Sequence, residues 1–236
     1  PEMVVESLNR YFEHMVDIII DHNGIVDKYM GDAIMAFYGA PVQHENDSLL
    51  AVQTGLDMLD GLKTFNMWQL ENNRPPFNIG IGINYGKVTV GNIGSEKKMD
   101  YTVIGDMVNT ASRLEGLTKI YGRSFIISGS VYEKVKDVFP CHQLDIVAVK
   151  GRHQGIPVYS VQRQLSSQEK NSMQIHSEGM KIYYKRNFKE ALNIFWKGQN
   201  LFPDDKLFEL YINRSLVFME TPPGEEWNGV TVMDHK

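Results

Sequence analysis

The sequence predicts an α+β domain followed by a short all-helical segment. Over residues 1–163, segments with helical periodicity alternate with short strand-like runs that meet at glycine-containing turns. Neighbouring runs joined by tight turns favour an antiparallel-rich sheet with helices packed on it. Beyond a polar stretch at residues 164–170 the strand signals stop, and the pattern becomes helical. We therefore predict two units, 1–163 and 164–236.

Composition excludes several classes of protein. The chain has 236 residues, of which 42% are hydrophobic and 22% charged, as in ordinary globular proteins. A net charge of −5 and a pI near 5.8 argue against a nucleic-acid-binding domain. No apolar run reaches the length of about 18 residues that a membrane span needs. The single cysteine, Cys141, excludes an internal disulfide framework and indicates a reducing compartment, so we expect a cytoplasmic module.

The first elements are predicted in order from the N-terminus. Residues 1–20 carry an apolar stripe at helical spacing, and we expect material ahead of Pro1 to belong to the same domain. Residues 24–39 contain two strand-like runs around Gly31 and Asp32, typical of a tight hairpin. A long helix is predicted over residues 45–72, ending before the two prolines that follow Arg74.

The remaining elements of the first unit follow from glycine positions and apolar runs. Residues 77–94 predict two strands turning at Gly86, and we interpret Gly91 and Gly94 as hairpin turns rather than as a phosphate loop. Residues 99–106 predict a further strand, and Asp106 is expected to cap a helix over residues 107–120. A strand at 123–128, a short helix at 129–135 and strands near 144–149 and 158–161 complete the unit.

A few polar residues have side chains suited to a phosphate-containing ligand. Asp32, at a hairpin tip, offers the hard oxygen that Mg²⁺ prefers. Asn109 and Arg113 are four residues apart and share one helix face, where an amide and a guanidinium suit a sugar or a phosphate. Lys150 adds a point charge. Each signal is weak alone: Asp32 is equally typical of a turn, and the others, with Lys28, are typical of a solvated surface.

The joint pattern is far more specific than its parts. The segments Gly31–Phe37 and Tyr101–Gly116 closely resemble the corresponding motifs of class III nucleotidyl cyclases. The resemblance extends over residues 1–161. It implies a ferredoxin-like α+β fold that works as a head-to-tail homodimer, with each active site shared between the two protomers.

The resemblance also implies a role for each matching residue. Asp32 matches one of two aspartates that hold two divalent cations, Mg²⁺ or Mn²⁺. Asn109 matches the residue that orients the ribose, and Arg113 the residue that stabilises the transition state at the α-phosphate. Lys150 matches the lysine that binds the terminal phosphates. One protomer would hold the cations, and the other would supply the residues that bind substrate.

The implied reaction is attack of the ribose 3′-hydroxyl on the α-phosphorus, with release of pyrophosphate. One cation would lower the pKa of the hydroxyl, and both would neutralise the phosphate oxygens. Lys28 and Thr102 match the pair that reads the purine. Lysine only donates and threonine can accept, which fits the N1 acceptor and the amine of adenine, so we expect ATP as substrate. A guanine reader would need an acidic acceptor at position 28.

One feature of the family falls outside this sequence. Its other metal aspartate lies on a strand just before the opening helix, so we expect this chain to lack that strand and that ligand, which leaves its activity by itself open. An upstream sensor or regulatory domain is expected in the same polypeptide. Two alternatives remain: a guanylate cyclase, and a non-catalytic cyclase-like module that binds nucleotide or dimerises.

Residues 179–203 resemble one tetratricopeptide repeat. Gly179, Ala191, Phe195 and Pro203 are in register, whereas Ile182 and Gly198 depart from the usual pattern. One repeat cannot bury its own faces. We expect these helices to pack on the first unit, on a third helix at 206–220 or across a dimer, as a structural cap rather than a peptide-binding site. Trp227 is expected to anchor the tail, and His22, His44 and His142 to lie on the surface.

Overall fold

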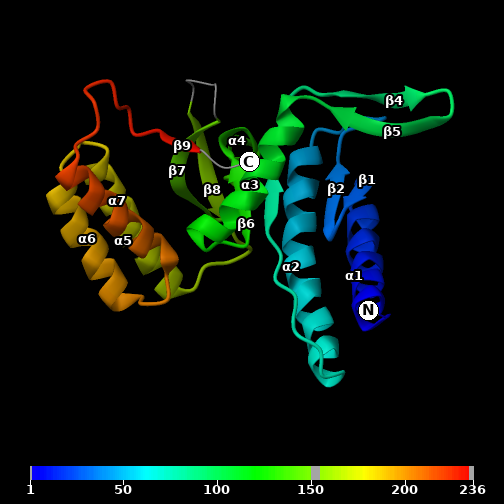
Figure 1. Cartoon of the computed structure of the whole chain (residues 1–236), viewed down its shortest axis with the longest axis horizontal. Coiled ribbons are helices and arrows are strands. Elements are labelled where there is room, and N and C mark those ends of the chain that lie inside the picture. The colour runs from blue at the N-terminus through cyan, green and yellow to red at the C-terminus, as the bar shows by residue number, and fades with distance from the viewer. Residues whose placement is uncertain (1, 150–154, 234–236) are drawn as a thin grey trace.

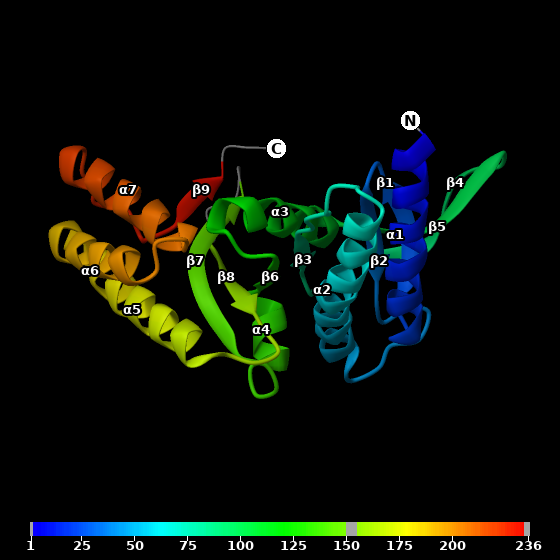
Figure 2. The same ribbon diagram turned by 90° about the horizontal axis from the view of Figure 1, so that it is seen from below.

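The computed structural model describes residues 2–149 and 155–233. The chain forms an elongated molecule with a mixed sheet at its centre (Figure 1). Three helices lie at one end of this sheet. Two helices and two β-hairpins lie at the other end, an arrangement that Figure 2 shows from below. The predicted α+β class is confirmed, and so is the helical C-terminal segment.

The central sheet has five strands in the order β3-β6-β8-β7-β9. The β3–β6 and β7–β9 pairs are parallel, and the β6–β8 and β7–β8 pairs are antiparallel. The last strand was not predicted, because its three residues follow a turn-rich stretch that carries no alternation. The strands are β3 (Ile81–Ile83), β6 (Phe125–Ser128), β7 (Cys141–Val149), β8 (Ile156–Val161) and β9 (Thr231–Met233).

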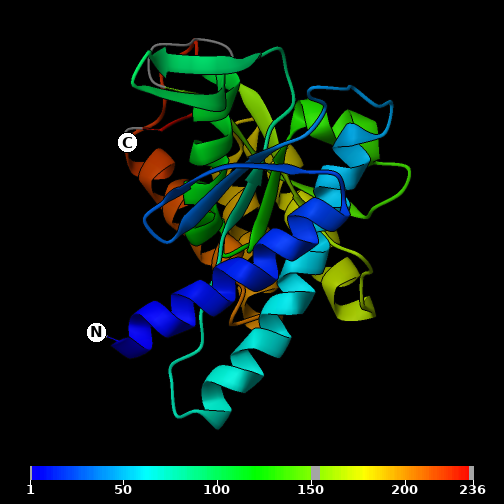
Figure 3. The same ribbon diagram turned by 90° about the vertical axis from the view of Figure 1, so that its right-hand side faces the viewer.

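Helices α1 (Glu2–Asp21) and α2 (Asp47–Glu71) pack side by side (Figure 3). Tyr11 and Met15 of α1 meet Leu62 and Phe65 of α2 in a small apolar cluster. The predicted stripe on the first helix is buried only along part of its length, since Val4 and Val5 are exposed. Strands β1 (Ile25–Met30) and β2 (Ala33–Phe37) form the predicted hairpin as a separate two-stranded sheet.

The predicted hairpin across Gly86 is wrong. Strand β4 (Thr89–Ser95) pairs with β5 (Lys98–Ile104), whereas β3 pairs with β6, so Gly86 lies in a connection between two sheets. Gly91 and Gly94 lie within β4 rather than at turns. The β4–β5 hairpin projects from the body of the molecule, at the upper right in Figure 1.

Helix α3 (Asp106–Tyr121) begins two residues after β5 and packs on β3, and the shorter α4 (Gly129–Val135) follows β6. A Cβ atom at Gly82 would lie 2.3 Å from the backbone nitrogen of Glu115, so only glycine permits this close approach. The helix begins one residue earlier than predicted: its N-cap is Gly105, and Asp106 is the first helical residue. Its negative charge still suits the helix N-terminus.

The C-terminal segment consists of α5 (Ser167–Tyr183), α6 (Phe188–Leu201) and α7 (Lys206–Glu220). Helix α5 begins inside the polar stretch that the sequence suggested as a linker. Ser166 and Glu169 form a capping box, in which the Glu169 backbone N–H donates to Ser166 Oγ at 3.2 Å and the Ser166 N–H donates to Glu169 Oε2 at 2.8 Å. A serine followed three residues later by a glutamate is a sequence signature of a helix N-terminus, and it indicates that α5 begins here.

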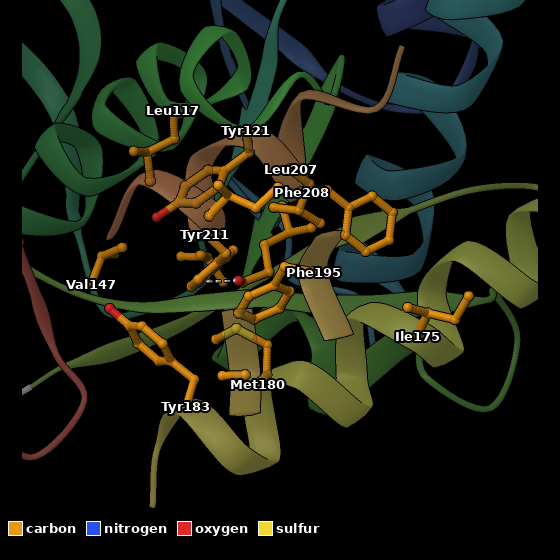
Figure 4. Packing of buried hydrophobic residues seen from close by; sticks show 14 of the residues in the cluster. Leu117, Tyr121, Val147, Ile175, Met180, Tyr183, Phe195, Leu207, Phe208 and Tyr211 are labelled. Atoms are coloured by element: carbon orange, nitrogen blue, oxygen red, sulfur yellow. Dashed lines mark hydrogen bonds between the residues drawn. The ribbon is translucent and has the colours of Figure 1, made fainter. Parts of the chain in front are cut away.

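These helices pack on the first unit and on one another, so two of the three packing alternatives occur. Apolar side chains from α3, β7, α5, α6 and α7 form one continuous cluster (Figure 4). Tyr211 of α7 also donates its hydroxyl to the carbonyl of Leu144 at 2.7 Å. Trp227 packs against Tyr183 and Phe218, which confirms that it anchors the tail. The likeness to a tetratricopeptide repeat and the boundary at 163 stay predictions.

Several polar groups buried in this region are paired across it. The Oδ2 atom of Asp145 accepts hydrogen bonds from Tyr121 at 2.6 Å, Arg214 at 2.7 Å and Thr231 at 3.0 Å. His142 is 5% exposed, so its predicted surface position is wrong; its Nε2 lies 3.1 Å from Nδ1 of His176. His142 lies on the face of β7 that contacts α5, where its ring approaches His176. The sequence of β7 alone does not reveal this contact.

Candidate functional site

The β1–β2 turn presents the predicted metal ligand. Asp32 is exposed at the turn and follows Gly31, whose φ of 67° suits a tight hairpin. Within the described residues, no group of three or more His, Cys, Asp or Glu side chains could hold a metal ion. Asp32 therefore offers one hard oxygen ligand, and the described part of the chain does not by itself fit a two-cation centre.

Lys28 and Thr102 are brought together by the contact between β1 and β5. The residue that joins them is Asp27, whose side chain is only 1% exposed. Thr102 Oγ1 donates to Asp27 Oδ2 at 2.6 Å, and the Val103 backbone N–H donates to the same oxygen at 3.2 Å. The Lys28 ammonium lies 3.3 Å from Asp27 Oδ1. Two hydrogen-bond donors and one ammonium group thus converge on one carboxylate.

Sequence analysis did not identify Asp27. Strand alternation carried no signal for it, because Asp27 lies at an irregularity in the β1–β2 register between Val26 and Lys28, and burial along β1 does not alternate. An acidic side chain that points inward needs partners. The threonine that supplies one of them is distant in sequence, and only the fold brings it close.

Asn109 and Arg113 lie on the first half of α3. Asn109 is exposed and Arg113 is half-buried, and they are one helical turn apart. In residues 2–149 and 155–233, no hydrogen bond or ion pair engages either side chain. An amide and a guanidinium without protein partners remain available to an external oxygen-rich group. Lys150, the predicted phosphate ligand, lies outside the described residues.

The structure joins some of the predicted residues and leaves others apart. Lys28 and Thr102 meet at Asp27, and the helix bearing Asn109 and Arg113 starts just after the strand bearing Thr102. No hydrogen bond or ion pair within the described range links Asp32 to any of them. A cavity of about 520 Å³ lies elsewhere, beside the Arg123–Asp205 ion pair near α5, and contains none of the predicted residues.

Comparison with known families identifies a match over most of the chain. The family described as "Adenylate and Guanylate cyclase catalytic domain" matches residues 1–163. Adenylate cyclase 1 of Rhizobium meliloti is 35% identical over 161 residues, which are 68% of this chain and 24% of that protein. The terminal-differentiation-specific adenylate cyclase of Dictyostelium discoideum is 30% identical over 226 residues, 92% of this chain and 10% of that protein. The chain thus spans a small part of these relatives.

Solved structures show the same fold. The adenylyl cyclase CyaB from P. aeruginosa matches with a TM-score of 0.63 and 35% identity, covering 70% of this chain and 87% of that one. The guanylyl cyclase Cya2 matches with a TM-score of 0.61 and 37% identity, covering 68% and 81%. A guanylyl cyclase domain from the aquatic fungus Blastocladiella emersonii, described as a non-canonical dimer, matches with a TM-score of 0.56 and 25% identity, covering 67% of this chain and 84% of that one. No helix in the described part of this chain is long and apolar enough to cross a membrane.

Proposed function

Because the chain belongs to the family of adenylate and guanylate cyclase catalytic domains, we propose that it converts ATP to 3′,5′-cyclic AMP and pyrophosphate in intracellular signalling. The observation that carries the choice of ATP is the cluster of Lys28, Asp27 and Thr102. The relatives named as adenylate cyclases add support.

Base recognition follows from hydrogen-bond complementarity. The Lys28 ammonium has only donors, which suit the N1 acceptor of adenine. Thr102 can accept from the exocyclic amine. Guanine carries N–H at N1 and an acceptor at O6, so it would set a donor against Lys28. An unsatisfied polar group in such a site costs about 1–3 kcal/mol, enough to favour ATP by about 5- to 140-fold.

The phosphate side of the reaction would use α3. The ribose 3′-oxygen would form a bond to the α-phosphorus and pass its proton to solvent water, and the bond from the α-phosphorus to the pyrophosphate oxygen would break. Asn109 would orient the ribose, and Arg113 would meet the charge that grows on the α-phosphate oxygens in the transition state. Lys150 would bind the terminal phosphates. Asp32 would contribute one ligand to the divalent cations that this family typically uses, and those cations would neutralise phosphate charge.

We further propose that the active species is a head-to-tail homodimer. Asp32 stands on a hairpin with no described interaction to the other candidate residues, and a dimer would let Asp32 of one protomer serve the nucleotide held by the other. A fungal relative is described as a non-canonical dimer, which supports self-association of such a domain and leaves the head-to-tail arrangement as our proposal.

A guanylate cyclase is the second candidate. The observation that favours it is the similarity to the guanylyl cyclase Cya2, at 37% identity. The presence of lysine rather than an acidic residue at position 28 favours ATP over this alternative.

The test is product formation from ATP and from GTP with Mn²⁺, using the full-length native polypeptide at high concentration. We expect cyclic AMP as the main product, and its loss when Asp32 is changed to Ala. Asp57→Ala removes a carboxylate on α2 whose described polar contacts include none of the candidate residues, so it is the control and should keep activity. Cyclic GMP as the main product would favour the second candidate. No cyclic product under any condition would favour the non-catalytic module.

A further inference from the structure

We infer that Asp27 fixes the direction of the Thr102 hydroxyl and thereby makes Thr102 an obligatory acceptor, which selects adenine. This inference rests on the proposed role of Lys28 and Thr102 in reading the base. It assigns to Asp27 the part of a positioning residue, since it acts through Thr102 and Lys28 and not on the nucleotide itself.

The first step is that the Thr102 proton is already committed. A threonine hydroxyl has one hydrogen and two lone pairs, and it rotates to suit its surroundings. An ionised carboxylate can only accept, so the contact of 2.6 Å between Thr102 Oγ1 and Asp27 Oδ2 fixes threonine as the donor. The remaining lone pairs of Oγ1 can then accept, and the hydroxyl has no second hydrogen to donate.

The second step is that Asp27 cannot easily turn away. Its side chain is 1% exposed, and the same Oδ2 atom also accepts from the Val103 backbone N–H at 3.2 Å. Val103 follows Thr102 directly on β5, so backbone and side chain of this strand hold the carboxylate together. Its other oxygen, Oδ1, has no hydrogen-bond partner among the described residues and lies 3.3 Å from the Lys28 ammonium.

The third step concerns selectivity. A freely rotating threonine could donate to O6 of guanine or accept from the amine of adenine, so threonine alone discriminates poorly. With its hydrogen committed to Asp27, Thr102 would face O6 of guanine with a lone pair against a lone pair. The Lys28 ammonium carries three hydrogens, so its contact with Asp27 leaves donors for the N1 atom of adenine. Asp27 thus makes Thr102 an acceptor and leaves Lys28 a donor, the combination that pairs with adenine.

The experiment compares Asp27→Leu, Asp27→Asn, Thr102→Val and the double variant Asp27→Leu/Thr102→Val. The measured quantity is the ratio of kcat/KM for ATP to that for GTP, in the full-length native polypeptide. Competition binding of the non-cyclising α,β-methylene analogues of ATP and GTP supplies the same ratio without turnover. Thermal unfolding of each variant controls for folding, and Asp27→Ala replaces the leucine variant if that one does not fold.

We expect Asp27→Leu to lower the ATP:GTP ratio about tenfold, because the freed hydroxyl can then donate to O6. Asp27→Asn should keep the ratio within about threefold of wild type, since its amide oxygen can still accept from Thr102 and from Val103 N–H. Thr102→Val should also lower the ratio, and Asp27→Leu should have no further effect on the ratio in that background.

Equal loss of activity with both nucleotides in Asp27→Leu would overturn the inference, because it would show a purely structural role. A drop in the ratio in Asp27→Asn as large as in Asp27→Leu would also overturn it and would assign the effect to charge. If the wild type cyclises neither nucleotide, the proposed function fails, and the binding ratios still decide whether Asp27 controls base choice.

Discussion

Arg113 is the residue whose role in turnover is most directly testable. It is half-buried on α3 and has no protein partner among the described residues. A guanidinium placed where charge develops acts on the transition state more than on the bound substrate. We therefore expect Arg113→Ala to lower kcat about 100-fold or more and to change nucleotide affinity little. Steady-state kinetics and binding of α,β-methylene-ATP would separate the two effects, with Arg10→Ala on α1 as the control, and a main effect on affinity would contradict the assigned role.

At the scale of single residues, the sequence predicted the exposed groups better than the buried ones. Asp32, Asn109 and Lys28 lie at accessible positions on the turn, helix and strand expected for them. Asp27 and His142 were missed or misplaced because burial depends on partners far away in the chain. Thr102 comes 75 residues after Asp27, and His176 comes 34 residues after His142. Local periodicity cannot reveal such pairs.

At the scale of elements, the close approach of α3 to β3 positions the candidate residues. Gly82 permits it, because a Cβ there would lie 2.3 Å from Glu115 N and 2.4 Å from the carbonyl oxygen of Ala111. We expect Gly82→Ala to push α3 away from the sheet. The expected cost is about 1–3 kcal/mol of unfolding free energy. We also expect kcat to fall by more than the decrease in the amount of folded protein explains.

Chemical denaturation and activity per folded molecule would measure both effects. Gly116→Ala is a matched control, since a Cβ at Gly116, on the exposed side of α3, meets no neighbour within 4 Å. It should leave kcat unchanged and keep or raise stability. Normal activity and stability in Gly82→Ala would show that α3 does not depend on this contact.

Element types were predictable where the periodicity was long, and pairing was not. The helices α2 and α3 and the β1–β2 hairpin were found within a few residues of their bounds. The turn inferred at Gly86 was wrong, because strand runs next to each other in sequence were assumed to pair, whereas β3 pairs with β6, over 40 residues further on. Strand β9 escaped notice because a three-residue strand has too little alternation to detect.

At the scale of the whole molecule, the junction between the sheet and the C-terminal helices should be sensitive to acid. The pKa of His142 is lowered to about 4, chiefly by burial and to a smaller extent by nearby Arg123, while Asp205 opposes this shift. Burial likewise lowers the pKa of His176 well below its ordinary value, with contributions from Arg123 and Arg214. Both rings are therefore neutral in the folded protein at neutral pH.

The sign follows from proton binding. Histidine in the unfolded chain titrates near pH 6.5, so below that pH the unfolded state binds more protons and stability falls as pH decreases. Between pH 7.5 and 5, His142 alone should cost about 2 kcal/mol of unfolding free energy. Urea unfolding at several pH values in this range would measure it.

Matched variants assign the effect to the buried pair. His142→Gln and His176→Phe should each flatten the dependence on pH, whereas His44→Gln, at an exposed position, should leave it as in wild type. Equal slopes in all four proteins would show that the histidine pair does not control acid stability.

The apolar cluster that α3 shares with α5, α6 and α7 also has an evolutionary consequence. Leu114, Leu117 and Tyr121 of α3 belong to the same buried cluster as Tyr211 of α7, so a change of side-chain size on one helix must be matched on another. Where the C-terminal helices are present, their side chains and those of α3 should therefore have changed in step. Exchanging these helices between distant cyclases would require the second half of α3 to be exchanged with them.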